Sequence, residues 1–187
     1  CGSSYGGNSN YTKAAEELGQ VFLKRNLGLI YGGARVGLMG ILASTIHKRG
    51  GEVIGVIPEM LLKREVAFID LSDLRIVDSM HERKALMFEL ADGFIALPGG
   101  FGTIEEFFEI LTWAQLGFHS KPCGLLNING YFDFFIKFIN NANDEKFIEP
   151  EYLDMIILDK NADTLIDKML VYKPPKIDKA KRALKKV

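Results

Sequence analysis

The chain has 187 residues, a formal net charge of −1, 48% hydrophobic residues and 25% charged residues. This length suits one domain with a sizeable core, and the balance of apolar and charged residues excludes an intrinsically disordered chain. A net charge so close to zero gives no general attraction to nucleic acid or to a membrane surface. Any anion must therefore be recognised by a few groups placed at one site.

Apolar runs alternate with stretches of helical periodicity along the chain. In chain order, the pattern predicts a helix at 10–26, a strand at 27–31, a helix at 37–49, strands at 53–57 and 74–77, a helix at 80–91, a strand at 94–97, a helix at 103–116, a strand at 123–128, a helix at 131–141 and a strand at 154–158. Strands that alternate with helices of this length need crossover connections. We therefore expect an α/β, Rossmann-like fold with a mainly parallel sheet and helices on both faces.

The number of cysteines and the length of the apolar runs indicate the cellular compartment that we expect for the chain. Cys1 and Cys123 are too few for a disulfide framework and lack the paired spacing of a zinc site, so we expect a reduced, cytoplasmic setting. No apolar run approaches the roughly 20 residues of a membrane span, and no basic-then-apolar leader is visible. The opening Cys-Gly-Ser-Ser reads like the turn that follows a strand, so we expect further residues upstream.

One nucleotide-binding domain is expected over residues 1–172, followed by a basic tail over 173–187. A single acidic residue, Asp178, opposes the basic residues of the tail. After Pro174 and Pro175, these are Lys176, Lys179, Lys181, Arg182, Lys185 and Lys186. Such a tail is able to contact nucleic acid or acidic lipid. Because it has no interleaved aromatic residues, we favour a solvated terminal segment and expect neither partner.

Glycine-rich turns follow two of the predicted strands, and ligands of open α/β sheets bind where strands pass into helices. One turn is Gly-Gly-Ala-Arg-Val-Gly at 32–37, and the other is Pro-Gly-Gly-Phe-Gly-Thr at 98–103. Glycine permits positive φ and close approach of the backbone, while the start of the next helix favours an anion. A phosphate is therefore the expected ligand of these turns, although neither turn has the Lys-Ser/Thr pair of a Walker loop. A purely structural turn is the alternative for each.

Basic residues open the helix at 80–91, shortly before the second turn. Arg83 offers a planar fork suited to phosphate or carboxylate, and Lys84 follows it. The two side chains point about 100° apart on a helix, so they cannot do the same job. The alternative is an ordinary basic pair on the surface.

Three carboxylates, Glu105, Glu106 and Glu109, crowd the helix after the second turn. Thr103 and Glu106 fit a capping box, in which the glutamate reaches back to the helix N-terminus. Against this, carboxylates beside a phosphate site repel it unless cations balance them. The arrangement makes sense if one carboxylate stabilises a developing positive charge, such as the charge formed when a ribosyl bond is cleaved.

These motifs resemble, in their order, those of the LONELY GUY family. Pro-Gly-Gly-Phe-Gly-Thr-Ile-Glu-Glu at 98–106 resembles its PGGxGTxxE signature, and Met-His-Glu-Arg-Lys at 80–84 resembles its MHxRK segment. The segments at 1–4, 31–33, 37–40 and 112–117 also resemble its pattern, and the similarity runs from Cys1 to about Leu158. One departure is Ala34, where many relatives carry a third glycine.

The resemblance implies a cytokinin riboside 5'-monophosphate phosphoribohydrolase, which needs no cofactor and releases a free base and ribose 5-phosphate. It implies that Arg83 and Glu106 are catalytic and that the enzyme is a homodimer with its site near the subunit interface. The matching substrate-contacting positions are Glu65, Lys84, Gly99, Gly100, Phe101, Gly102, Thr103, Ile104, Glu105 and Thr112. Members are also labelled "possible lysine decarboxylase", but no sequence context here argues for the lysine Schiff base that pyridoxal phosphate chemistry needs.

On this interpretation, Glu106 lies against the ribose and stabilises an oxocarbenium-like transition state or positions water. The 5'-phosphate lies on the N–H groups of Gly99, Gly100, Gly102 and Thr103. Arg83 neutralises phosphate charge or binds the departing base, since a guanidinium does not release a proton in proteins. No metal site is expected, because the histidines at 47, 81 and 119 are scattered. A non-catalytic nucleotide or cofactor carrier of the same fold is the alternative, although a carrier has no use for the carboxylate.

Overall fold

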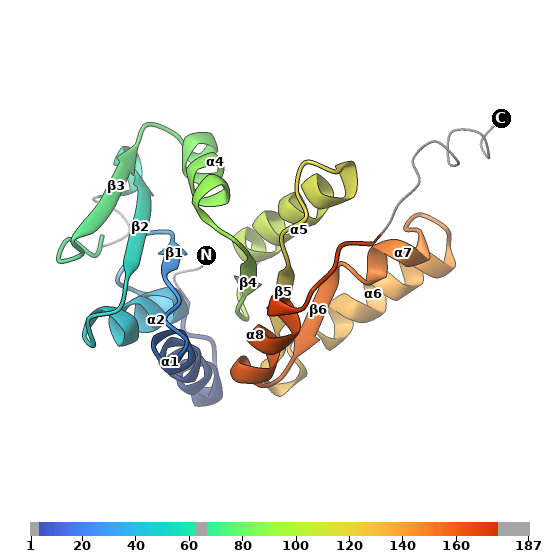
Figure 1. Ribbon diagram of the computed structural model, residues 1–187, viewed down its shortest axis with the longest axis horizontal. Helices are drawn as coiled ribbons and strands as arrows, with labels where there is room; N and C mark the ends of the chain where they lie inside the picture. The colour runs from blue at the N-terminus through green and yellow to red at the C-terminus, as the bar shows by residue number, and fades with distance from the viewer. Residues whose placement is uncertain (1–3, 63–66, 176–187) are drawn as a thin grey trace.

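The computed structural model describes residues 4–62 and 67–175, in which strands alternate with helices (Figure 1). The strands are β1 (Leu29–Tyr31), β2 (Val53–Pro58), β3 (Asp73–Val77), β4 (Phe94–Ala96), β5 (Cys123–Leu126) and β6 (Ile156–Asp159). The helices are α1 (Ser9–Lys24), α2 (Gly37–His47), α3 (Glu59–Leu62), α4 (Met80–Leu90), α5 (Phe101–Leu116), α6 (Asp133–Asp144), α7 (Pro150–Leu153) and α8 (Ala162–Leu170), with one 3₁₀ turn, η1 (Ile128–Gly130).

The strands follow the sequence prediction to within one or two residues at each end, because each apolar run is bounded by turn residues. The prediction omits α8, although its start carries a recognisable signal. The Asn161 side chain caps α8 by accepting a hydrogen bond of 3.0 Å from the Thr164 backbone N–H. Leu165, Ile166 and Met169 then form its buried face.

All pairings between the described strands are parallel, as predicted. Strand β2 pairs with β1 and β3, and β5 pairs with β4 and β6. The strands form two three-stranded sheets, ordered β1-β2-β3 and β4-β5-β6, rather than one continuous sheet. Figure 1 shows β1 and β4 as the inner strands of the two sheets.

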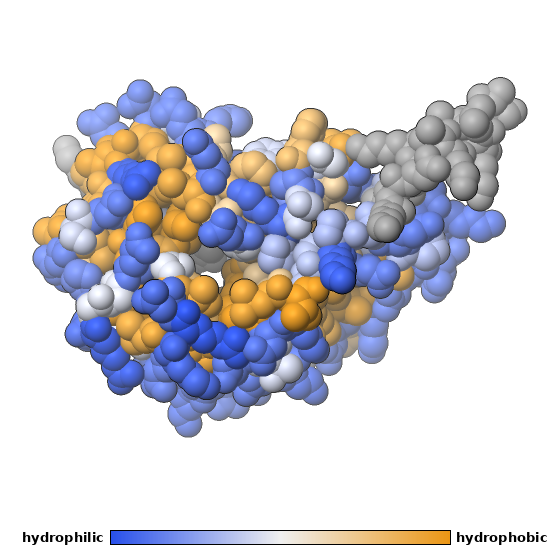
Figure 2. Space-filling model, in the orientation of Figure 1, coloured by the Kyte–Doolittle hydropathy of each residue, from blue (hydrophilic) through white to orange (hydrophobic). Residues whose placement is uncertain are grey.

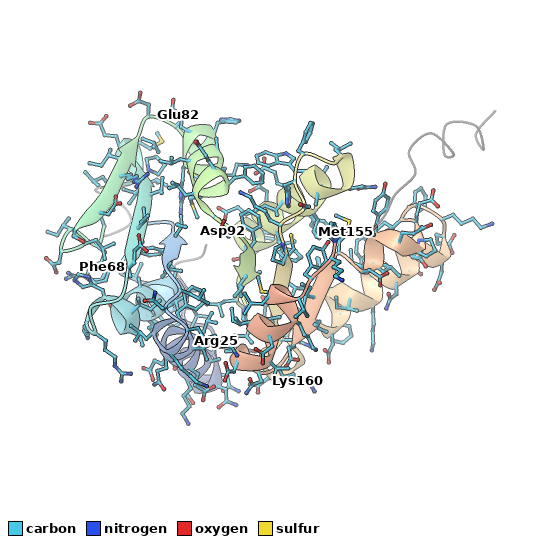
Figure 3. The ribbon with its side chains drawn as sticks, in the orientation of Figure 1. Arg25, Phe68, Glu82, Asp92, Met155 and Lys160 are labelled. Carbon is cyan, nitrogen blue, oxygen red and sulfur yellow. The ribbon has the colours of Figure 1, made fainter. Side chains whose placement is uncertain are left out.

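A shared apolar core joins the two sheets on the face covered by α1, α2 and α8. Its buried residues include Leu29 of the first sheet, Leu126 of the second and Leu165 of α8. At the end of α1, Arg25 forms an ion pair with Asp163 of α8, and Figure 3 shows Arg25 beside that helix. A second cluster on the opposite face packs α5 and α6 against β4 and β5. The two sheets are therefore held together through helices.

Within the residues described, no helix is both long enough and apolar enough to cross a membrane. Two sequence predictions lie outside these residues. They are Glu65, which falls within 63–66, and the basic tail from 176 onward.

Candidate functional site

The second glycine-rich turn leads into α5, which begins earlier than predicted. The helix starts at Phe101 rather than at Thr103. Gly100 occupies the N-cap position with φ −87° and ψ −152°, and no side chain caps the helix. The capping box predicted for Thr103 and Glu106 is therefore wrong, because both residues already lie within the first turns. No side-chain cap closes the N-terminus of this 16-residue helix, which is where proteins commonly bind anions.

The glycines of this turn matter for the space that a missing side chain leaves rather than for an unusual backbone conformation, since none of them has a positive φ. A methyl group at Gly99 would overlap the Thr103 hydroxyl and lie 2.9 Å from Thr103 Cβ, so packing requires glycine there. A methyl group at Gly100 or Gly102 would meet nothing within 4 Å. These two glycines therefore border open space at the start of α5. The Tyr131 hydroxyl donates a hydrogen bond of 2.6 Å to the Gly99 carbonyl and so steadies the turn.

Lys84 of α4 balances two of the three carboxylates on α5. Its Nζ donates hydrogen bonds of 2.9 Å to Glu105 and 3.0 Å to Glu109. The bond to Glu105 raises the pKa of Lys84, against the opposing effect of burial, so the ammonium is charged at neutral pH. One positive charge is thus shared by two carboxylates, which relieves the repulsion that the sequence predicted.

Glu106 is the remaining carboxylate, and it is half-buried at the wall of a cavity of about 360 Å³. Lys84, Gly99 and Thr103 line the same cavity. Glu106 forms no hydrogen bond or ion pair with any residue in 4–62 or 67–175. The cavity is within the size range of small-molecule sites. Figure 2 shows the surface hollowed between the two halves of the molecule, with apolar side chains at its border.

Arg83 lies beside the first glycine-rich turn. It is 3% exposed, and its Nη2 donates a hydrogen bond of 3.4 Å to the carbonyl of Gly32 in the first glycine-rich turn. A methyl group at Gly32 would overlap Nη2 and lie 3.1 Å from Cζ, so glycine is required for this approach. Arg83 is not among the residues that line the cavity. Its catalytic role stays a prediction, and the observed contact couples it to the first turn.

The first turn accommodates its departure from the family pattern without strain. Ala34 is fully buried, forms an antiparallel bridge with Ala67 and has no positive φ. Positive φ occurs instead at Gly33 (77°) and Gly37 (70°). Arg35, which follows the alanine, lies 4.7 Å from the centre of the Phe68 ring.

The other predicted substrate-contacting residues lie outside the cavity. Ile104 packs into the second core cluster, which explains its half-buried side chain. Thr112 is exposed, and its hydroxyl donates a hydrogen bond of 2.7 Å to the Phe108 carbonyl of its own helix. Phe101, at the first position of α5, is 98% exposed. Gly100, Gly102 and Glu105 are also not among the residues that line the cavity. The structure thus brings Lys84, Gly99, Thr103 and Glu106 together at the cavity wall, and the other six predicted substrate-contacting residues that the structure describes do not line it.

The sequence reasoning did not identify the apolar wall of the cavity. Met87 and Phe88 of α4 and Trp113 of α5 line it. Phe88 and Trp113 form an edge-to-face pair with ring centres 4.9 Å apart. Helical periodicity marks such residues as inward-facing but does not separate a core from a cavity wall. Across the described residues, no group of three or more His, Cys, Asp or Glu is placed to hold a metal ion.

The fold and the position of the cavity define the class of the protein. Parallel strands flanked by helices, with a cavity bordered by the glycine-rich turn that follows β4, make the chain a Rossmann-like α/β protein. The solved structures that resemble it support this class. They include the molybdenum cofactor binding protein from Rippkaea orientalis, with a TM-score of 0.62 and 21% identity, covering 86% of each chain. The molybdenum cofactor carrier protein from Chlamydomonas reinhardtii has a TM-score of 0.64 and 18% identity, covering 88% of this chain and 90% of the carrier.

Sequence relatives identify the family within this class. A family model described as "Possible lysine decarboxylase" matches residues 39–169. Cytokinin riboside 5'-monophosphate phosphoribohydrolase LOG3 of Arabidopsis thaliana is 46% identical over 174 residues, which cover 93% of this chain and 81% of the relative. The phosphoribohydrolase LOG of Oryza sativa is 48% identical over 174 residues, covering 93% of this chain and 72% of the relative. The chain therefore belongs to the LONELY GUY family.

Proposed function

We propose that the chain hydrolyses the N-glycosidic bond of adenosine 5'-monophosphates, including N6-modified ones, and releases the free base and ribose 5-phosphate. One observation carries the proposal. The Glu106 carboxylate lines the cavity without a partner among the described residues, while Lys84 engages its neighbours Glu105 and Glu109. A carboxylate held in this way is available to a positive charge on a bound molecule.

The phosphate binds at the N-terminus of α5. The first N–H groups of a helix have no partner within the helix, and the helix dipole adds positive potential at that end. Gly100 and Gly102 leave open space there, so the backbone can approach the phosphate oxygens closely. Thr103, which lines the cavity one residue further on, brings the phosphate site next to Glu106.

The ribose lies between this phosphate site and Glu106. As the bond from C1' to the base nitrogen breaks, its electron pair leaves with the base and positive charge develops on the ribose. Glu106 stabilises this charge and positions the water whose oxygen bonds to C1'. The water proton passes to the carboxylate or to solvent, and the base takes up a proton as it departs. Arg83 holds the Gly32 carbonyl and thereby the shape of the first turn.

The experiment is to incubate the chain with AMP, with isopentenyladenosine monophosphate and with adenosine, and to measure free base by liquid chromatography. We expect equal amounts of base and ribose 5-phosphate from at least one nucleotide and almost no base from adenosine, because the nucleoside lacks the phosphate. Tight binding of nucleotides without any release of base would refute hydrolysis and favour the carrier alternative.

We further propose that the chain is a homodimer and acts in the cytoplasm. Large exposed aromatic side chains support the dimer, since Phe101 of α5 and Phe134 and Phe138 of α6 are 98%, 79% and 60% exposed. Light scattering should give twice the chain mass of 20.9 kDa, and a mass of 20.9 kDa at micromolar concentration would contradict the dimer. The small number of cysteines supports the reducing compartment.

A further inference from the structure

Tyr131 connects the loop that follows β5 to the second glycine-rich turn, which follows β4. Its hydroxyl donates a hydrogen bond of 2.6 Å to the Gly99 carbonyl, although the two residues are 32 positions apart in the chain. A distance this short is near the lower end of the range for hydrogen bonds between two oxygens. The bond is therefore well formed, even though Tyr131 is 42% exposed.

Contacts on two sides hold Tyr131 in this place. The buried Asn127 side chain accepts a hydrogen bond of 2.8 Å from the Phe132 N–H and so fixes the backbone directly after Tyr131. The Tyr11 ring of α1 lies edge-to-face against the Tyr131 ring, with the ring centres 5.9 Å apart. The position of the hydroxyl is therefore set by contacts other than its own hydrogen bond.

The hydrogen bond to Gly99 fixes the orientation of the peptide unit between Gly99 and Gly100. No peptide bond in the described residues is cis, and in a planar trans peptide the C=O and N–H groups point in opposite directions. Because the Gly99 carbonyl points toward Tyr131, the Gly100 N–H points away from it. Gly100 is the N-cap residue of α5, and its N–H donates to no other backbone group in the part of the chain that the structure describes. This N–H is therefore available to a ligand at the start of the helix.

Without the tyrosine hydroxyl, the same peptide unit would reverse at little cost. It lies between two glycines, and glycine adopts a wider range of backbone conformations than any other residue. A reversed peptide unit would present the Gly99 carbonyl oxygen at the helix N-terminus in place of the Gly100 N–H. The partial negative charge of that oxygen would repel a phosphate, whereas a row of N–H groups attracts one. The Tyr131 hydroxyl thus stabilises the orientation that presents a donor.

We propose that Tyr131 is a positioning residue that holds the Gly100 N–H toward the 5'-phosphate and so favours phosphate esters over ligands without phosphate. This role rests on the phosphate site of the proposed function. It requires no contact between Tyr131 and the ligand, because the hydroxyl holds one end of a peptide unit whose other end donates to the phosphate. A hydroxyl that served stability alone would affect unfolding but would not distinguish between ligands.

The test is Tyr131→Phe, which removes the hydroxyl and keeps the ring beside Tyr11. The ligands are ribose 5-phosphate and adenine, because neither contains the bond that the proposed reaction cleaves. Calorimetry should show that the variant binds ribose 5-phosphate about tenfold more weakly than the parent, as expected for one lost hydrogen bond to a charged group. The affinity for adenine should stay within about twofold, as for a substitution away from the bound group.

Nuclear magnetic resonance of the Gly100 amide tests the orientation of the peptide unit directly. Saturating ribose 5-phosphate should shift this amide signal in the parent chain, because the N–H then donates a charge-assisted hydrogen bond, and by less than about half as much in Tyr131→Phe. Tyr172→Phe is the matched control, since it removes the same hydroxyl from a tyrosine that lies just after α8. It should match the parent in both affinities and in the amide shift.

Three results would overturn the role of Tyr131. One is an unchanged affinity of Tyr131→Phe for ribose 5-phosphate, even with a lower melting temperature, because the hydroxyl would then serve stability alone. Another is an equal loss of affinity for ribose 5-phosphate and adenine. The third is a Gly100 amide that does not respond to ribose 5-phosphate in the parent chain. A failure of the proposed reaction is seen separately, since a parent chain that binds ribose 5-phosphate through Gly100 but releases no base from nucleotides would refute hydrolysis alone.

Discussion

Replacing Gly32 by alanine tests the placement of Arg83, because the three heavy atoms nearest to the added methyl group all belong to that residue. The methyl overlaps Nη2, so the guanidinium must move by roughly 1 Å or more in a closely packed interior. Arg83 is 3% exposed and bonds to the Gly32 carbonyl, so the shift strains packing and weakens a charged hydrogen bond. Overpacking of about 1–3 kcal/mol and a similar loss from the hydrogen bond give a destabilisation of about 3 kcal/mol.

The assay is thermal and urea unfolding, together with the rate of base release. For a chain of this length, about 3 kcal/mol corresponds to a fall in melting temperature of about 6–12 °C. We expect kcat/KM to fall by about 100-fold, because displacement by about 1 Å is enough for such a loss. Gly7→Ala is the matched control, since a methyl group there meets nothing within 4 Å and its φ is not positive. It should change stability by less than about 0.5 kcal/mol.

A double-mutant cycle isolates the cause. Arg83→Met keeps an unbranched side chain but removes the atoms that the new methyl group would strike. Gly32→Ala made in the Arg83→Met background should therefore destabilise by less than about 1 kcal/mol. If Gly32→Ala costs as much with methionine at position 83 as with arginine, the steric reasoning is refuted.

Three further predictions concern the second turn, the carboxylates and the response to acid. Gly102→Leu should leave the protein as stable or up to about 1 kcal/mol more stable, because leucine favours helix over glycine, yet calorimetry should show AMP bound at least about tenfold more weakly. Unchanged affinity would place the phosphate elsewhere. Lys84→Gln leaves Glu105 and Glu109 without their cation, so KM for AMP should rise by about tenfold in steady-state kinetics, and an unchanged KM would remove Lys84 from the site. Burial lowers the pKa of His119 below its ordinary value of 6.5. Below pH 6.5, the unfolded state therefore binds more protons than the folded state. The free energy of unfolding should then fall as the pH drops from 7 to 5. Urea unfolding of His119→Gln should show a smaller fall than the parent chain, whereas His81→Gln, at an exposed position, should behave like the parent.

Local sequence signals predicted the elements well where apolar runs meet glycine or proline. The strand at 94–97 is an example, since Pro98 and Gly99 end the run that begins at Phe94 and the structure has β4 at Phe94–Ala96. The predicted start of α5 at Thr103 is wrong for a physical reason, since the helix begins at Phe101. Thr103 and Glu106 have the spacing of a capping box, but a glycine can occupy the N-cap position without any side-chain bond, and Gly100 does so.

Contacts between distant residues could not be predicted from spacing. Lys84 and Glu105 are 21 residues apart, and their ion pair depends on how α4 and α5 lie across β4. The contact between Arg83 and Gly32 spans 51 residues and depends on the packing of α4 against β1. Adjacent residues on a helix point in different directions, which is why Arg83 and Lys84 reach different turns. Helix geometry therefore predicted different roles for Arg83 and Lys84, but it did not predict which turn each side chain contacts.

The most direct measurement compares Glu106→Gln with Glu89→Gln, an exposed change of the same kind on α4. AMP affinity is measured by calorimetry and base release by single-turnover kinetics. Glu106→Gln should bind AMP within about threefold of the parent while the rate of bond cleavage falls by about 1,000-fold or more, and Glu89→Gln should match the parent in both. Cleavage by Glu106→Gln at a rate close to that of the parent would contradict the assignment of this carboxylate to the positive charge on the ribose.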